Sequence, residues 1–417
     1  MTIQRRDFSK GLAAAALAGA PAMAAAAPRA HTLYAATGSV MAWRSLDTMT
    51  GASGKVGSIT LPSPIQYAWP HPNGRFLYVA TSDAPGGSVG GGSIHRLIAL
   101  RIGRGGALSL HGEPAVLGQR PVHMSLDPAG HYALVAYNAP ANISIHTIRP
   151  DGTVGDMVRQ GEKLDLGIFP HQVRMMPGGK SVVLVTRGND ATATRPEDPG
   201  ALKVFDFDHG HLANAQSIAV GGRGGLGYGP RHLDFHPHLP VAYVGLERQN
   251  QLHTHRILGA HLAPEPELIA STTDQPPKGE GGATTLVGAI HVHPRGHALY
   301  ISNRASSTVE VDGRKVFAGG DNSIAVFALN PRTGLPKLVQ RVDPRGFHLR
   351  CFAISPDGRM LAAASMVDMM LRDGSVNPAG LSLFRIRPDG TLAFLRKIDT
   401  PVGKEAQLWT SILPVPA

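Results

Sequence analysis

The chain has 417 residues, 42% of them apolar and 17% charged, so it can bury a large core and is neither disordered nor collagen-like. Its 50 Gly and 33 Pro predict many turns and few long helices, which favours an all-β protein. The formal net charge of +10 suits anionic small molecules, whereas the scattered basic residues and the 6% aromatic content argue against nucleic acid as a partner.

The first 27 residues are typical of an export signal. Arg5 and Arg6 are followed by Phe8, Lys10 and an Ala-rich apolar run that ends in small residues. The RRDF sequence resembles signals read by the twin-arginine export machinery. The apolar run is shorter than the roughly 20 residues of a membrane span. We therefore predict a signal at 1–27, one domain at 28–417, a periplasmic location and no membrane association after signal removal.

Cys351 is the only cysteine, which excludes an intramolecular disulfide, a CxxC metal site and a haem attachment motif. In the segment RCFAISP the alternation of apolar residues predicts that Cys351 is buried. A buried thiol is expected to be inert rather than a nucleophile.

A short phrase, usually with Pro and Gly in a turn that leads into an apolar strand, recurs along the chain. The copies are HPNGRFLYVA, DPAGHYALVA, MPGGKSVVLV, HPHLPVAYVG, HPRGHALYIS and SPDGRMLAAA, which begin at His71, Asp127, Met176, His236, His293 and Ser355. A period of roughly 50 to 60 residues is typical of propeller blades rather than helical solenoids.

Six copies and an incomplete one at 31–38 predict an all-β, seven-bladed β-propeller with four antiparallel strands in each blade. We expect the N-terminal segment to pair with the C-terminal segment AQLWTSIL, because closure removes exposed sheet edges. The alternative, two stacked β-sandwich domains, would not predict a regular repeat along the whole chain.

In such a blade the start of the innermost strand and the end of the second strand lie at the same mouth of the central channel. The residues five positions before the first residue of each phrase are Gln66, Val122, His171, Arg231, Gly288 and Arg350. The residues eleven positions after it are Ser82, Asn138, Arg187, Glu247, Arg304 and Met366. Six of these twelve residues are charged or His. A cationic mouth with a single carboxylate is therefore expected, and concave mouths are common ligand sites.

The motifs PH at Pro170, GPRH at Gly229, IHVHP at Ile290, SNR at Ser302 and DNSIAVF at Asp321 resemble the seven-bladed β-propeller lactonase family. That family includes propeller-type 6-phosphogluconolactonases and carboxymuconate lactonising enzymes. The resemblance covers essentially everything after the signal, although TRGND and ASMVDMM depart from the family pattern at two strand ends. It implies a lactone hydrolase, a carboxylic ester hydrolase without cofactor, with four catalytic residues: His171, Arg231, Glu247 and Arg304. Six further residues are predicted to bind substrate: His123, Asn138, Arg187, His232, His291 and Arg350.

Opening a lactone needs an activated water and donors for the negative charge that grows on the carbonyl oxygen. His171 or Glu247 could be the base, and Arg231 and Arg304 offer forked donors. We expect no acyl-enzyme route through a serine nucleophile. Three HxH pairs, which begin at His236, His253 and His291, have a spacing compatible with metal ligands. Hydrogen bonds within turns explain the first and third pairs better, and no metal is predicted.

The expected substrate is a sugar lactone, either 6-phosphogluconolactone or, given export, an unphosphorylated aldonolactone. Three other functions stay open. The same residues could catalyse a muconate-type cycloisomerisation, or the propeller could be a non-catalytic binding module of the envelope. A metal redox propeller would fit the 20 His, but it lacks cysteine ligands and haem motifs.

Overall fold

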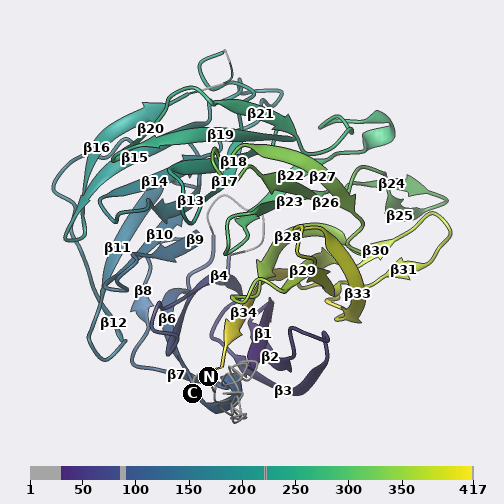
Figure 1. The fold of residues 1–417 in the computed structure, drawn as a ribbon, viewed down its shortest axis with the longest axis horizontal. Helices are drawn as coiled ribbons and strands as arrows, with labels where there is room; N and C mark the ends of the chain where they lie inside the picture. Colours follow the sequence, from purple (N-terminus) through teal and green to yellow (C-terminus); the bar gives the residue numbers. More distant parts are fainter. Residues whose placement is uncertain (1–29, 85–90, 220, 222, 416–417) are drawn as a thin grey trace, which may run out of the picture.

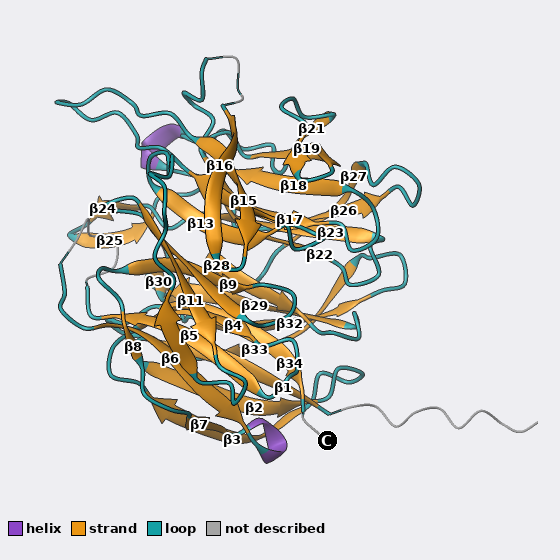
Figure 2. Cartoon of the chain, turned by 90° about the vertical axis from the view of Figure 1, so that its left-hand side faces the viewer, coloured by secondary structure: helices purple, strands orange, loops and turns teal. Residues whose placement is uncertain are grey.

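The computed structural model describes residues 30–84, 91–219, 221 and 223–415, so the predicted export signal lies outside the described residues. Seven antiparallel sheets, each with a path of four strands, are arranged radially as a seven-bladed β-propeller, as the repeat predicts (Figure 1). Figure 2 shows from the side that strands joined by loops make up nearly all of the regular secondary structure. The described residues contain two single-turn 3-10 helices, η1 (Arg104–Gly106) and η2 (Glu280–Gly282), and no helix suited to spanning a membrane.

The strands of each blade are given from the innermost outwards. Blade 1 contains β34 (Gln407–Pro414), β1 (His31–Thr37), β2 (Val40–Leu46) and β3 (Ser53–Thr60). Blade 2 contains β4 (Ile65–Pro70), β5 (Phe76–Ser82), β6 (His95–Ile102) and β7 (Leu108–Leu110), with β8 (Ala115–Val116) also paired to β6. Blade 3 contains β9 (Pro121–Leu126), β10 (Tyr132–Tyr137), β11 (Asn142–Ile148) and β12 (Val154–Met157). Blade 4 contains β13 (Pro170–Met175), β14 (Ser181–Thr186), β15 (Ala201–Asp208) and β16 (His211–Ile218).

Blade 5 contains β17 (Pro230–Phe235), β18 (Val241–Leu246), β19 (Gln251–Leu258) and β20 (His261–Leu262), with β21 (Leu268–Ser271) also paired to β19. Blade 6 contains β22 (Leu286–Val292), β23 (Ala298–Arg304), β26 (Ile324–Leu329) and β27 (Pro336–Val342). Blade 7 contains β28 (Phe347–Ile354), β29 (Met360–Val367), β32 (Gly380–Ile386) and β33 (Leu392–Asp399). Two hairpins project from the ring in Figure 1: β24 (Thr308–Val311) with β25 (Arg314–Phe317), and β30 (Met369–Met370) with β31 (Val376–Asn377).

The ring is closed by strands from the two ends of the described chain. β1 pairs antiparallel with β34 from His31 opposite Pro414 to Thr37 opposite Gln407. The predicted closure by the C-terminal segment is therefore confirmed. The innermost strands also lie beside their neighbours around the channel.

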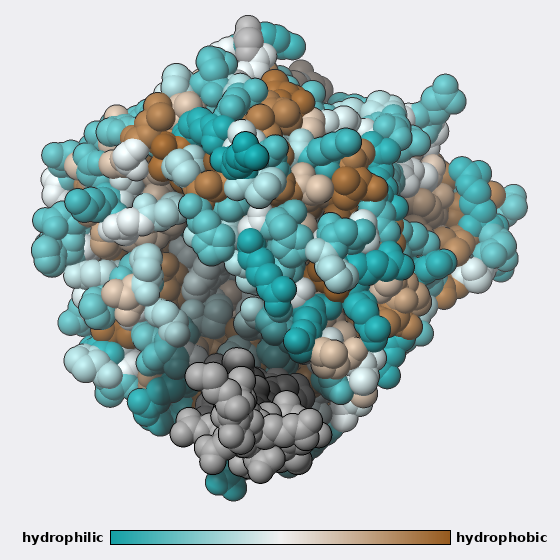
Figure 3. All heavy atoms as spheres, in the orientation of Figure 1, coloured by the Kyte–Doolittle hydropathy of each residue, from teal (hydrophilic) through white to brown (hydrophobic). Residues whose placement is uncertain are grey.

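The hydrophobic core lies between blades. Each of the seven blade interfaces contains its own cluster of buried apolar side chains, for example Val185 of blade 4 with Val244 of blade 5. Cys351 is buried in the cluster between blades 1 and 2, as its sequence context predicts. The face seen in Figure 3 is mainly hydrophilic, with scattered hydrophobic residues and a hollow near its centre.

The recurring turns connect adjacent blades. His71, His236 and His293 each accept a backbone N–H at Nδ1 within their own turn. Each also contacts, through Nε2, the carbonyl oxygen of the turn glycine in the next blade, at 3.1, 2.9 and 2.8 Å. At those three glycines φ lies between 72° and 78°, and a Cβ atom would lie 2.3 to 2.6 Å from the histidine ring. The repeat therefore needs glycine for its backbone conformation and for interblade contact.

Buried tyrosines reinforce four of the blade interfaces. Each donates its hydroxyl to the carbonyl oxygen of a glycine in the next blade's outer hairpin, at 2.6 to 2.8 Å. The tyrosines are Tyr34, Tyr78, Tyr243 and Tyr300. These contacts satisfy hydroxyl groups that would otherwise be buried at a cost of about 1 to 3 kcal/mol each.

Candidate functional site

A β-bulge interrupts the innermost strand of every blade near its start. In blade 4, Pro170 opposes Thr186 and Gln172 opposes Val185, so His171 is the extra residue. Arg231 is the extra residue of blade 5 in the same way. In the other blades the strand register changes at Gln66, Val122, Arg350, Leu408 and the Gly288–Ala289 pair. A bulge re-aims its side chain and leaves it outside the regular ladder.

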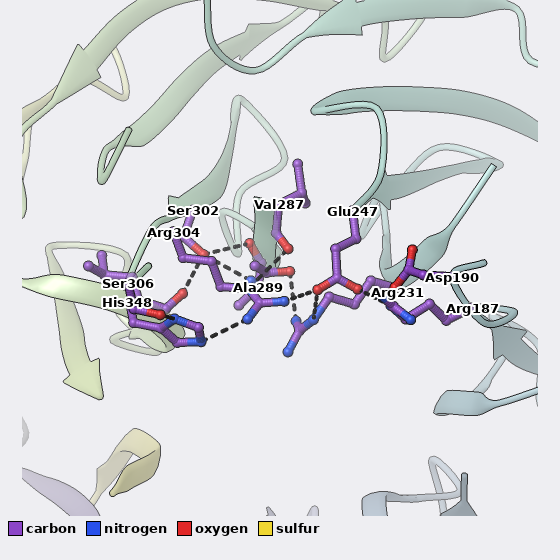
Figure 4. Close-up of polar contacts among 12 residues, drawn as sticks. Arg187, Asp190, Arg231, Glu247, Val287, Ala289, Ser302, Arg304, Ser306 and His348 are labelled. Atoms are coloured by element: carbon purple, nitrogen blue, oxygen red, sulfur yellow. Dashed lines mark hydrogen bonds and ion pairs between the residues drawn. The ribbon is translucent and has the colours of Figure 1, made fainter. Parts of the chain in front are cut away.

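Three arginines surround one buried carboxylate at the mouth where these strands begin (Figure 4). Glu247 directly follows β18, and its side chain is 6% exposed. Arg187 places Nε 2.5 Å from Oε2 of Glu247, and Arg304 contacts Oε1 through Nη2. Arg231 lies slightly further away, with Nε 4.0 Å from Oε1. The structure thus brings Arg231, Glu247 and Arg304 together with the predicted substrate-binding residue Arg187.

Arg231 keeps donors free at the centre of this group. The residue is 1% exposed, and its Nη1 donates to the carbonyl oxygen of Gly288 at 2.9 Å. Its Nε and Nη2 are buried and find no hydrogen-bond partner in the described part of the chain. Two unpartnered donors on a fully buried guanidinium are rare, because each costs free energy unless a water or ligand satisfies it.

Arg304 is held by its own set of contacts. Its Nε donates to the carbonyl oxygen of Val287 at 3.2 Å, and its Nη1 donates to Nε2 of His348 at 2.8 Å. Because arginine only donates, Nε2 of His348 is the acceptor, and neutral His348 donates from Nδ1 to the Ser306 hydroxyl at 2.6 Å. Gly288 leaves the room for this packing, since a Cβ atom there would lie 3.3 Å from Cδ of Arg304.

The electrostatics of the cluster fix Glu247 in its charged form. Burial would raise the pKa of Glu247, but Arg304, Arg187 and Arg231 outweigh it and lower the pKa to about 2. Burial lowers the pKa of Arg231 well below its ordinary value, and Arg304 and Arg350 add to this effect. A carboxylate with such a low pKa is a weak proton acceptor at neutral pH.

Three buried histidines lie side by side next to the arginines. The ring centroid of His232 is 5.1 Å from that of His171 and 5.7 Å from that of His123. Burial and nearby arginines lower the pKa of all three well below 6.5, so they are neutral at neutral pH. Nδ1 of His171 has no hydrogen-bond partner and is therefore available to accept a proton.

Further charged residues hold the side chain of Arg187 in place. Its Nη2 donates to Asp190 at 2.8 Å, and Asp190 also lies 3.0 Å from Nε of Arg248. Arg248 in turn contacts Glu197 at 2.5 Å. The segment TRGND, which departs from the family pattern, thus supplies Asp190 to orient a residue of the cluster.

The remaining predicted residues occupy different places. Arg350 is half-buried in the bulge of β28, and burial, with Arg304 and Arg120, lowers its pKa to about 10. Asn138 follows β10 and makes no hydrogen bond with the cluster in the described part of the chain. His291 lies further along β22, where its Nδ1 is 3.7 Å from Asp234, which pairs with Arg174 at 3.1 Å. The structure therefore separates His291 from the cluster, because it lies three residues beyond the bulge at Gly288.

Tyr67 lies between the cluster and the other end of the channel. Its ring centroid is 4.1 Å from that of His123, and it also lines a cavity of about 270 Å³ with Trp69 and Trp409. His291 lines the same cavity. The mouth with Glu247 and this opposite cavity are therefore distinct ends of one channel.

Sequence reasoning missed His348, Asp190 and Arg120, the partner of Gln66. Arg120 donates to the side-chain carbonyl of Gln66 at 3.0 and 3.2 Å. His348 lies two residues before Arg350 on the same strand, so the strand periodicity could have indicated it. Its positive φ of 55° could not be read from the sequence.

The structure explains the HxH pairs by local contacts. His236 and His293 make the turn contacts described above, which confirms the turn interpretation. His255 contacts the carbonyl oxygen of Ala263 at 2.9 Å, and His253 contacts the side chain of Gln251 at 3.2 Å. Within the described ranges, no group of three or more His, Cys, Asp or Glu side chains could hold a metal ion.

A closed seven-bladed ring with arginines around a single carboxylate at one mouth defines a propeller of the lactonase class. The family model described as a seven-bladed β-propeller lactonase matches residues 31–371. The chain therefore belongs to the seven-bladed β-propeller lactonase family, and the resemblance drawn from its motifs is confirmed. It is accordingly an enzyme of the carboxylic ester hydrolase class.

Two relatives and one solved structure illustrate this relationship. The chain is 25% identical over 373 residues to a 6-phosphogluconolactonase of Yersinia enterocolitica, covering 87% of this chain and 92% of the relative. It is 28% identical over 254 residues to a 6-phosphogluconolactonase of Pectobacterium carotovorum, covering 61% and 68%. The periplasmic gluconolactonase of Pseudomonas aeruginosa shares the fold with a TM-score of 0.68 and 19% identity, covering 93% of this chain and 100% of that chain.

Proposed function

We propose that this lactonase hydrolyses an anionic or polyhydroxylated sugar lactone of the gluconolactone type at the mouth that contains Glu247. The names of the relatives support the gluconolactone class. The observation that carries the proposal is the buried guanidinium of Arg231, whose Nε and Nη2 have no hydrogen-bond partner among the described residues. These two donors suit an oxygen on which negative charge develops, and loss of such a donor costs roughly 10² to 10³ in rate.

In the proposed reaction, His171 accepts a proton from water while the water oxygen bonds to the lactone carbonyl carbon. Arg231 donates to the carbonyl oxygen as it becomes negative. The bond between the carbonyl carbon and the ring oxygen then breaks, and the proton held by His171 passes to the ring oxygen. One water is consumed, and the product is the open hydroxy acid, which ionises at neutral pH.

Glu247 is a positioning residue in this proposal rather than the base. Nδ1 of His171 has no hydrogen-bond partner among the described residues, whereas arginines engage both oxygens of Glu247, which favours His171 of the two bases that the sequence left open. The carboxylate holds Arg187 and Arg304 and balances part of their charge. With Arg350 also at this mouth, four arginines face one central carboxylate, an excess of positive charge that favours a substrate with a phosphate or carboxylate group.

Proton release from glucono-1,5-lactone and from its 6-phosphate, measured against spontaneous hydrolysis and with a chelator present, tests this proposal. Chelator-resistant acceleration, with at least a roughly 10²-fold loss in His171→Gln, is the expected result. A His171→Gln variant as active as wild type would overturn the assignment of the base. No acceleration of either lactone would overturn the substrate class and favour the muconate-type reaction or a binding propeller.

We also propose that the protein acts in the periplasm after twin-arginine export. The support is the sequence of residues 1–27, together with the periplasmic protein of Pseudomonas aeruginosa that shares the fold. Replacing Arg5 and Arg6 by Lys, followed by cell fractionation, tests the route. Retention of the variant in the cytoplasm is expected, and unchanged export would refute it.

A further inference from the structure

A basic pocket lies on the face of the propeller opposite Glu247. It has a volume of about 410 Å³ and is formed by the turns and outer hairpins of blades 6, 7 and 1. Its walls carry four arginines and two histidines: Arg295, Arg359, Arg385, Arg387, His293 and His297. No carboxylate of the described chain lines it. Its volume falls in the range of small-molecule sites.

The four arginines of this pocket are not neutralised by the protein. Arginines elsewhere, such as Arg174 and Arg341, form ion pairs with aspartates at 3.1 and 2.5 Å. None of the four pocket arginines has a carboxylate within 4.0 Å among the residues that the structure describes. Asp389, whose pKa is lowered by hydrogen bonds from Thr391 and also by Arg387, offsets part of this charge, and the remaining repulsion is reduced by solvent or by a bound anion.

Two of the arginines are oriented by the same residue of blade 1. Arg385 donates from Nη2 to the carbonyl oxygen of Met49 at 2.8 Å, and Nη1 of Arg359 lies 2.9 Å from Sδ of Met49. Each of these exposed arginines makes this one side-chain contact and keeps its remaining guanidinium donors free of hydrogen bonds within the described chain. Arg295 donates only its backbone N–H, to His293 at 3.1 Å, and makes no hydrogen bond through its guanidinium in the described structure.

The nearest acidic side chains already have hydrogen-bond partners. Asp357 accepts from the hydroxyls of Thr48 and Ser355 at 2.6 and 2.5 Å. Asp389 accepts from the hydroxyl of Thr391 at 2.7 Å. These contacts hold both carboxylates in their own turns, so the pocket keeps several free guanidinium donors.

We propose that this pocket binds a phosphate group, either of a free small molecule or of a lipid headgroup. A phosphate presents several oxygens in different directions and can therefore engage more than one guanidinium fork, whereas one carboxylate occupies a single fork. The site is distinct from the reaction centre. The innermost strands span the molecule from the mouth to the turns, which for six residues corresponds to roughly 20 Å.

Methyl NMR of the full chain titrated with inorganic phosphate tests this proposal, because Met49 reports on the pocket. The chain has 12 Met; Met157 on blade 3 serves as the internal reference, and Met366 near the mouth reports phosphate bound there instead. The test variant is Arg359→Gln/Arg385→Gln. Phosphate is expected to shift the Met49 methyl signal in the wild type. The double variant should need at least about tenfold more phosphate for the same fraction of the shift.

The matched control is Arg75→Gln/Arg332→Gln, which removes the same charge from exposed arginines outside the pocket. It should titrate like the wild type, and equal melting temperatures should show that both variants fold. A Met49 response in the wild type that the control keeps and the test variant loses supports a free phosphate ligand.

A second arm uses vesicles of phosphatidylcholine with and without phosphatidylglycerol. Binding to the anionic vesicles alone, with Met49 broadening and loss in the test variant, supports the proposal with a lipid headgroup as the source. Three outcomes would overturn it: no Met49 response to phosphate or vesicles, equal responses in both double variants, or a phosphate response confined to Met366.

Discussion

Replacing Glu247 by Gln should destabilise the protein strongly, because the three surrounding arginines would lose the charge that balances them. The pKa of Glu247 is lowered from 4.5 to about 2, a difference of 2.5 units. At about 1.36 kcal/mol per unit, this corresponds to about 3 kcal/mol of stability at neutral pH. The value agrees with the roughly 3 to 5 kcal/mol lost when one partner of a buried ion pair is removed.

The pH dependence follows from the direction of the shift. A carboxyl with a depressed pKa in the folded state contributes stability above its unfolded value of 4.5 and loses it as the pH falls towards 2. The difference in unfolding free energy between wild type and Glu247→Gln should therefore shrink by about 2 kcal/mol between pH 7 and pH 3.

Urea unfolding followed by tryptophan fluorescence measures this difference. The control is Glu267→Gln, which makes the same change in the half-exposed pair with Arg256 and should cost at most about 1 kcal/mol. A loss in Glu247→Gln no larger than in the control, or a difference that stays constant from pH 7 to pH 3, would show that Glu247 does not balance the buried arginines.

Three further predictions concern activity and blade contacts. His171→Gln should lower kcat/KM by at least about 10²-fold in initial-rate assays, while His261→Gln, on the surface, leaves it unchanged. Burial lowers the pKa of His171, so this residue is still unprotonated at pH 6. As the pH is lowered, kcat/KM should therefore fall only below pH 6.5, and a fall with its midpoint at pH 6.5 would contradict this. Tyr243→Phe should lower the free energy of unfolding, measured by urea unfolding, by about 1 to 2 kcal/mol, because the Gly334 carbonyl loses its 2.6 Å hydrogen bond. A loss no larger than in the control Tyr132→Phe would contradict this.

The sequence was sufficient to predict the propeller because each blade repeats the same local rule. Turn glycines and the apolar second strand recur at one period, and the structure confirms seven blades closed by β1 and β34. The turn histidines were also interpretable, because His236 and His293 occupy positions where other blades carry Asp or Ser. Local turn chemistry therefore provided the strongest signal.

The candidate site was only partly predictable, for a reason that lies in the strands. Counting from the turns selected His171 and Arg231, and both are bulged residues. A bulge leaves no mark in the alternation of apolar and polar residues, so counting gave the position but not the direction of each side chain. The separation of His291 from the cluster, and the support of Arg187 by Asp190, depend on tertiary contacts that no local pattern encodes.

The closure of blade 1 also constrains when the protein can fold. Its innermost strand, β34, comes from Gln407–Pro414, whereas its other three strands come from residues 31–60. During synthesis those three strands must wait, with one edge of β1 unpaired, until residues 407–414 have left the ribosome. Ring closure consequently cannot precede the synthesis of β34, and a nascent chain stalled before Gln407 would be exposed to edge-to-edge aggregation at β1.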